Sequence, residues 1–186
     1  MFHVLHFLPL YFQADAGAGP SQLDSERDHA LLTNSGSDMQ LAISHALVLF
    51  YETFPKAAIR KIEVDYSNKY NDYLIKIKGI DVENSYEIKI DLSDHRLLER
   101  SMTLLPDRKQ DGVGLAREAI SLKDVLPFDV ILAKVQEEIS QSDFYKCELE
   151  GYGRLLKWEF HFRNGQETIQ IDLDGETGHI FDVTYD

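Results

Sequence analysis

The sequence is poor in cysteine, in positive charge and in long apolar runs, and each shortage excludes a class of protein. Cys147 is the single cysteine among 186 residues, which excludes an intrachain disulfide framework and any metal site built from several thiolates. The 19 Lys and Arg residues face 32 Asp and Glu residues, so the net charge is −13 and the basic clusters that bind nucleic acid or anionic membranes are missing. No run of about 18 apolar residues exists, so the sequence predicts no membrane-spanning helix.

The residues that are present suffice for a globular core, since hydrophobic residues make up 44% of the chain. Cys147 lies in an alternating, strand-like segment and is predicted to be a small core side chain rather than a reactive thiol. Residues 1–35 are predicted to be a leader or a disordered segment. Residues 1–12 are apolar and small residues follow them, but the first basic residue is Arg27, so the charged start of a signal peptide is missing.

The second half of the chain repeats the apolar pattern of the first half. One helical stripe recurs 85 positions later, where Ile43, Leu47, Phe50 and Phe54 correspond to Phe128, Leu132, Val135 and Ile139. The second strand-like segment recurs at the same spacing, so Tyr73 is aligned with Trp158. The third segment recurs at 81 positions, with Asp91 aligned on Asp172. This alignment predicts a four-residue deletion in the loop between the second and third strands, where loops tolerate changes of length.

The first copy is predicted to be a helix followed by four strands. Ser37 and Gln40 form a capping-box pattern ahead of the helix, and Pro55 helps to end it. Strands are predicted where apolar and charged residues alternate, over residues 58–66, 73–78, 86–92 and 97–105.

The second copy has the same order of elements. Ser121 with Asp124 is predicted to cap a first helical turn, and Pro127 is tolerated in that turn but would bend a longer helix. Three strands and a closing strand are predicted over residues 142–150, 155–163, 166–173 and 180–183. Asn164-Gly165 is the strongest hairpin signal in the chain.

These patterns predict an α+β fold, with two repeats of one helix packed on a three- to four-stranded antiparallel sheet. The predicted domains are repeat 1 over residues 36–105, a linker over 106–118 and repeat 2 over 119–186. The linker begins at Pro106 and is rich in glycine and charge. The patterns leave open whether the two sheets join.

The end of the second copy resembles a known family. Residues 171–180 contain an aspartate, a Thr177-Gly178 turn and an apolar residue, which resembles the closing signature of PepSY domains. The resemblance covers residues 119–186. It reaches repeat 1 only through the internal repeat, because residues 91–97 keep the aspartate but lack the Thr-Gly turn. It implies a bacterial, secreted or surface-tethered, non-catalytic module associated with the restraint of peptidases, with no catalytic residues to carry over.

Candidate chemical sites have simpler structural interpretations. The alternate carboxylates of residues 172–176 lack the twelve-residue ligand pattern of a calcium loop and favour a tight turn instead. Asp91 and Asp172 are predicted to position their turns by accepting hydrogen bonds from backbone amides. The GxG fragments at residues 112–114 and 151–153 lack the context of a phosphate loop and are predicted to be turns.

Seven histidines occur without the spacing of a zinc hydrolase, at positions His3, His6, His29, His45, His95, His161 and His179. His161 is predicted to be a solvated strand residue. The paired carboxylates Glu137-Glu138, and Glu148 with Glu150, are predicted to lie on wet faces rather than to form an acid–base pair. Tyr73 and Trp158 are predicted to pack in the core. No catalytic residue, cofactor or metal is therefore predicted.

The predicted function is a non-catalytic binding module of the bacterial cell envelope that restrains or regulates a peptidase or wall enzyme. Its predicted location is extracytoplasmic or at the cell surface, and its predicted partner is a protein rather than nucleic acid. The alternative is a cytoplasmic, acidic, immunity-type inhibitor that mimics nucleic acid toward a basic protein, motivated by the charge of −13. An enzyme or a small-molecule carrier built on a cleft between the copies is a third hypothesis.

Overall fold

Each half of the chain forms a helix followed by four antiparallel strands, as the sequence predicts. The computed structural model describes residues 36–106, 118–139, 142–153 and 155–186. The first half contains α2 (Gly36–Thr53), β1 (Ala58–Ser67), β2 (Asp72–Ile80), β3 (Asn84–Asp91) and β4 (Leu97–Leu104). The second half contains the 3₁₀ turn η2 (Leu122–Asp124), α4 (Phe128–Glu138), β5 (Asp143–Tyr152), β6 (Leu155–Asn164), β7 (Glu167–Asp174) and β8 (Ile180–Tyr185). The predicted leader and most of the predicted linker lie outside the described residues.

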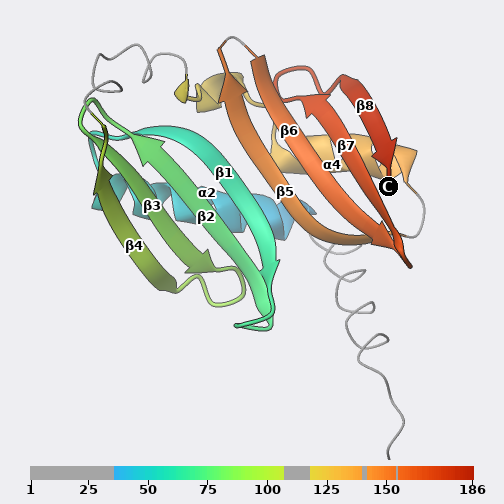
Figure 1. The fold of residues 1–186 in the computed structure, drawn as a ribbon, viewed down its shortest axis with the longest axis horizontal. Helices are drawn as coiled ribbons and strands as arrows, with labels where there is room; N and C mark the ends of the chain where they lie inside the picture. The colour runs from blue at the N-terminus through green and yellow to red at the C-terminus, as the bar shows by residue number, and fades with distance from the viewer. Residues whose placement is uncertain (1–35, 107–117, 140–141, 154) are drawn as a thin grey trace, which may run out of the picture.

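The predicted fold class is wrong in its central feature, because the strands form one sheet rather than two. The eight strands are ordered β4-β3-β2-β1-β5-β6-β7-β8 (Figure 1). The two halves join through antiparallel pairing of β1 with β5, from Lys61 opposite Glu150 to Asp65 opposite Lys146. The physical reason is that an unpaired β1 would leave a row of backbone N–H and C=O groups without partners, and β5 satisfies them.

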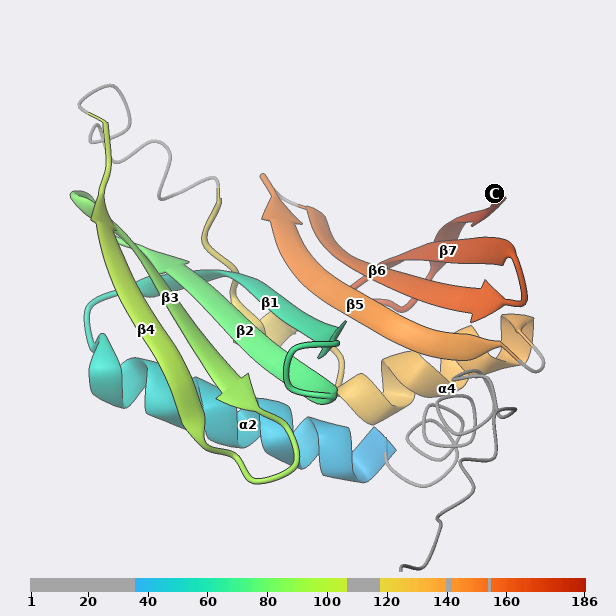
Figure 2. The same cartoon turned by 60° about the horizontal axis from the view of Figure 1, so that its bottom comes forward.

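Helices α2 and α4 lie on the same side of the sheet, and no helix of the described residues covers the opposite side (Figure 2). Strand side chains alternate between the two sides, so Ile62, Val64 and Ile75 point toward the helices and are buried. Phe50 of α2 and Ile131 of α4 are also fully buried against this face. The buried residues form one continuous core that extends through both halves. We call the side without helices the open face.

The structure corrects the alignment of the two copies. Val64 pairs with Ile75, and its counterpart Leu149, 85 positions later, pairs with Trp158. Trp158 therefore corresponds to Ile75 rather than to Tyr73, at a spacing of 83.

The same spacing of 83 holds through the later strands. Asp91 N–H donates to the carbonyl of Arg96, and Asp174 N–H donates to that of His179. Asp174, not Asp172, is therefore the counterpart of Asp91. The predicted four-residue deletion between the second and third strands is wrong, and the copies differ instead by two residues in the first hairpin turn.

The helix starts also differ from the predictions. Leu122–Asp124 forms only a 3₁₀ turn, and Ser121 makes no side-chain capping bond. Pro127 precedes α4 directly, since its fixed φ suits the start of a helix. The Gln40 side chain instead serves the other half, because its Oε1 accepts a hydrogen bond of 2.6 Å from the Phe128 amide at the start of α4. The side chain of Ser37 lies outside the described residues.

Turn residues adopt the conformations that their positions require. Gly165 has φ 65°, which suits the predicted Asn164-Gly165 hairpin. Gly178 has φ 68°, and His95, which stands 83 positions earlier, has φ 56°. Histidine therefore occupies in repeat 1 a left-handed position that glycine occupies in repeat 2. None of the helices in the described ranges is long and apolar enough to span a membrane.

Candidate functional site

Charged side chains cover the open face, because every second residue of each central strand points away from the helices. Lysines alternate with carboxylates both along the strands and across them. The charged and polar residues of this face include Lys61, Glu63, Asp65, Lys76, Lys78, Glu87, Lys89, Lys146, Glu148, Glu150, Lys157, Glu159, His161 and Asp172.

The junction of the two halves lies at the centre of this face. Glu63 of β1 lies directly opposite Glu148 of β5, an arrangement in which like charges repel. Lys61 offsets this repulsion, since its Nζ lies 2.9 Å from Glu148 Oε2, 2.8 Å from Glu150 Oε1 and 3.7 Å from Glu63 Oε2. Lys146 Nζ lies 2.7 Å from Glu148 Oε2 on the other side. The junction is therefore a network in which each carboxylate has at least one ammonium partner.

The same arrangement continues into both halves. In the first half, Lys76 Nζ lies 2.6 Å from Glu63 Oε1 and 3.1 Å from Asp65 Oδ2. In the second half, Lys157 Nζ lies 2.6 Å from Glu159 Oε2 and 2.8 Å from Asp172 Oδ2. Lysine thus bridges neighbouring strands in both halves.

The network holds its groups in their charged forms. Burial alone would lower the pKa of Lys61, but hydrogen bonds to Glu150 and Glu148 outweigh it and raise the pKa above its usual range. Burial would raise the pKa of Glu148, but hydrogen bonds from Lys146 and Lys61 outweigh it and lower the pKa. A general acid or base works best with a pKa near the operating pH. These shifts move both groups away from neutrality, so they suit a fixed charge pattern rather than proton transfer.

The predicted core residues lie in the core. Cys147 is fully buried, and burial raises the pKa of its thiol. Tyr73 is buried, and its Oη donates a hydrogen bond of 2.6 Å to the Phe144 carbonyl in the other half. Trp158 is 2% exposed, and its ring packs edge-on against that of Phe128. All three predictions are confirmed.

The turn after β7 is organised by Asp174. Its Oδ1 accepts hydrogen bonds from the amides of Glu176, at 2.9 Å, and Thr177, at 2.8 Å. Asp91 acts in the same way in repeat 1, as predicted, by accepting from the Ser93 amide and hydroxyl. The prediction for Asp172 is wrong, since its carboxylate lies on the open face beside Lys157.

Four of the histidines lie in the described ranges, and the rings of two of them are in contact. His161 Nε2 lies 2.8 Å from Glu159 Oε1 on the open face, and it is half-buried rather than fully solvated. His45 and His95 have ring centroids 5.1 Å apart. No group of three or more His, Cys, Asp or Glu residues that could hold a metal ion occurs in the described ranges. Residues 151–153 form the end of β5 and its turn, whereas His3, His6, His29 and residues 112–114 lie outside these ranges.

The edge strand β4 exposes apolar side chains that the sequence analysis did not single out. Met102 is 64% exposed and Leu104 is 69% exposed. Met102 lies directly opposite Tyr86, whose ring packs on Phe54 at a centroid distance of 4.5 Å, so Met102 points to the helix side of the sheet. The edge strand β8 exposes Tyr185, which is 62% exposed. Within the described part of the chain, each edge strand has one strand neighbour, so its other side is available for pairing.

These features define an antiparallel sheet protein with helices on one face, a charged open face and two free edges. Comparisons with protein-family models and with curated proteins found no match. A comparison with solved structures found the crystal structure of "a putative lipoprotein" from Clostridium difficile 630, with a TM-score of 0.68 and 18% sequence identity. The similarity covers 76% of this chain and 90% of the Clostridium difficile chain. At this identity the likeness shows a shared fold and no more.

Proposed function

We propose that this chain is a non-catalytic binding module of the bacterial cell envelope that restrains or regulates a peptidase or wall enzyme. The observation that carries the proposal is the free edge of β4 with its exposed apolar side chains. An extended segment of a partner could pair with this strand, because none of the other described strands pairs with the backbone on its outer side. Side chains of the added strand would then cover Met102 and Leu104.

The placement in the envelope has two supports. The closing turn of repeat 2 resembles that of PepSY domains, and Asp174, Thr177 and Gly178 are all used in that turn. The structurally similar Clostridium difficile protein is "a putative lipoprotein", and lipoproteins are attached to membranes through lipid.

The net charge motivates the hypothesis that the chain mimics nucleic acid. The arrangement of charge on the open face argues against it. Mimicry of a phosphate backbone requires a dense, uncompensated negative surface. On the open face, lysines lie within 4.0 Å of Glu63, Asp65, Glu148 and Glu150. The central carboxylates are therefore already paired.

An affinity capture from fractionated bacterial extract tests the proposal with matched variants. The full chain is compared with a Met102→Lys/Leu104→Lys variant, because charges on an edge strand block strand addition. A Leu41→Lys/Val48→Lys variant, which changes two exposed side chains of α2, is the control. We expect a peptidase or wall hydrolase from the envelope fraction, bound by the chain and the control and lost with the β4 variant.

Two results would contradict the proposal. Capture of a basic cytoplasmic protein that is lost at moderate salt would favour the acidic mimic. Equal capture of an envelope enzyme by the β4 variant would exclude this edge as the binding surface. Circular dichroism of each variant confirms that it is folded.

A further inference from the structure

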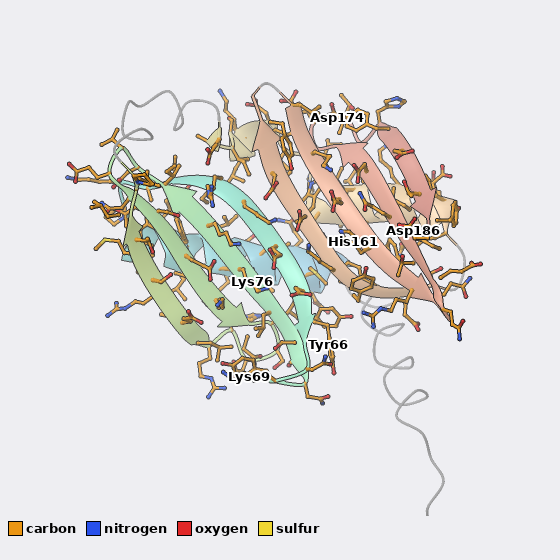
Figure 3. The ribbon with its side chains drawn as sticks, viewed as in Figure 1. Tyr66, Lys69, Lys76, His161, Asp174 and Asp186 are labelled. Atoms are coloured by element: carbon orange, nitrogen blue, oxygen red, sulfur yellow. The ribbon has the colours of Figure 1, made fainter. Side chains whose placement is uncertain are left out.

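A pocket of about 380 Å³ lies on the open face, beside the turn between β1 and β2. The turn contributes Lys69 and Tyr70, and the strands contribute Leu74, Lys76 and Lys89. Leu98 and Glu99 of β4 lie on its far side. Figure 3 shows Lys69 and Tyr66 at the β1–β2 turn and Lys76 further along β2.

The turn that forms this pocket is the part of repeat 1 that differs in length from repeat 2. Residues 68–71 connect β1 to β2, whereas residues 153–154 alone connect β5 to β6. The longer turn is held in shape by Asn71, which has φ 51° and whose Oδ1 accepts a hydrogen bond of 2.8 Å from Tyr66 Oη. The extra residues are Lys69 and its neighbours, so the pocket is built by what distinguishes the two copies.

Part of the pocket is apolar, although it lies on a charged face. Leu74 points to the open face, since its neighbours Tyr73 and Ile75 point to the core, and yet it is only 4% exposed. Leu98 is half-buried, and Tyr70 is 40% exposed at the rim. The apolar surface that a ligand could contact therefore lies at Leu98 and Tyr70, beside the polar groups that would orient it.

The lysines around the pocket differ in how many carboxylates lie close to their ammonium groups. Lys76 lies within 3.1 Å of two carboxylates, and Lys89 lies 2.9 Å from Glu99 and 3.2 Å from Glu87. Lys69 Nζ instead lies 3.1 Å from Tyr70 Oη and 4.8 Å above the Tyr70 ring centroid, with no carboxylate within 4.0 Å among the described residues. Lys69 therefore forms no ion pair within 4.0 Å among the described residues, and the carboxylate of Glu99 on the other side of the pocket interacts with its charge only at longer range.

We propose that this pocket binds a small carboxylate with an apolar body, with the carboxylate at Lys69 and the body on Leu98 and Tyr70. The volume of 380 Å³ is near the lower end for ligand sites, so it fits a molecule the size of one or two amino-acid residues. Such a group occurs as a free acid and as the C-terminal residue of a short peptide. The site lies on the open face rather than on the outer side of β4, so the proposal does not depend on the proposed function.

The test is a titration of the isotope-labelled full chain, followed by backbone amide shifts in NMR spectra. N-acetyl-leucine is the probe, N-acetyl-leucinamide is its neutral control, and acetate is the control without an apolar body. We expect N-acetyl-leucine to shift amides of residues 65–76 and 98–99 with a Kd on the order of 1 mM, which is what ligands of this size reach. The amide and acetate should bind about tenfold more weakly or not at all.

Two charge-matched variants decide whether Lys69 is the anion contact. Lys69→Gln should weaken binding of N-acetyl-leucine about tenfold, because a charge-assisted hydrogen bond is lost. Lys123→Gln removes the same charge from an exposed site outside the pocket and should leave the Kd unchanged. Equal binding of the acid and the amide, shifts centred elsewhere, or equal losses in both variants would each overturn the proposal.

A peptide then distinguishes the two sources of the carboxylate. Ala-Ala-Ala-Leu with a free C-terminus is compared with N-acetyl-leucine on the same amides. Tighter binding of the peptide would identify a peptide C-terminus as the ligand. Equal or weaker binding would identify a free small acid.

Discussion

Lys61 stabilises the junction between the two halves, and its replacement by methionine tests how the single sheet is held together. Its side chain is 15% exposed and lies close to Glu148 and Glu150. An exposed ion pair contributes about 0.2–1 kcal/mol, so two close pairs contribute about 0.4–2 kcal/mol. Loss of Lys61 also leaves Glu63 opposite Glu148 with less compensation, which adds about 0.2–1 kcal/mol. We therefore expect Lys61→Met to lower the free energy of unfolding by about 1–3 kcal/mol.

Urea unfolding is the assay, because the single tryptophan, Trp158, is buried and its fluorescence reports unfolding. Lys78→Met is the matched control on the same face, since Lys78 Nζ has one carboxylate contact, at 3.7 Å from Glu87. It should cost less than about 0.5 kcal/mol. A second change, Glu148→Gln, should restore part of the stability lost in Lys61→Met because it removes the like-charge pair. Equal losses in Lys61→Met and Lys78→Met would refute the reasoning.

Three further predictions follow from single contacts. The pKa of Glu148 is lower in the folded state than in the unfolded state. Its contribution to the free energy of unfolding is therefore complete above the unfolded pKa of about 4.3 and is lost as the pH falls through the folded pKa. The free energy of unfolding, measured against pH, should decrease below about pH 4.5. A Cβ at Gly79 would overlap the Phe50 ring, so Gly79→Ala should lower the thermal midpoint at a cost of about 1–3 kcal/mol, whereas Gly36→Ala, which has ordinary contacts, should not. Gln40→Ala removes the cap of α4 and should cost about 1 kcal/mol in urea unfolding, with amide exchange increased at the start of that helix; unchanged exchange there would contradict the capping role.

The sequence predicted the elements well and their alignment between copies poorly, and both results have one cause. A strand alternates with a period of two, so spacings of 81, 83 and 85 all place apolar residues on the same face. Alternation therefore identified the faces of β2 and β6 but could not show that Trp158 corresponds to Ile75. The pairing of Val64 with Ile75 and of Leu149 with Trp158 settled the matter, and this pairing exists only in the folded chain.

The pairing of β1 with β5 had a signal in the sequence that alternation alone does not reveal. Lys61, Glu63 and Asp65 in one strand face Glu150, Glu148 and Lys146 in the other, so opposite charges meet at both ends of the junction. The charge pattern of β1 and β5 became informative only once the structure showed that these two strands are neighbours.

Sequence by itself determined the local structure of this protein: its helices, its eight strands, its buried faces and its duplication. These depend on periodicity and turn chemistry within short segments. Tertiary structure alone decided that the strands form one sheet, that Gln40 caps the helix of the other half, and that Lys69 lies at the rim of a pocket with Leu98. Each of these joins residues far apart in the chain, and contacts between distant segments depend on how whole elements pack rather than on the residues nearby.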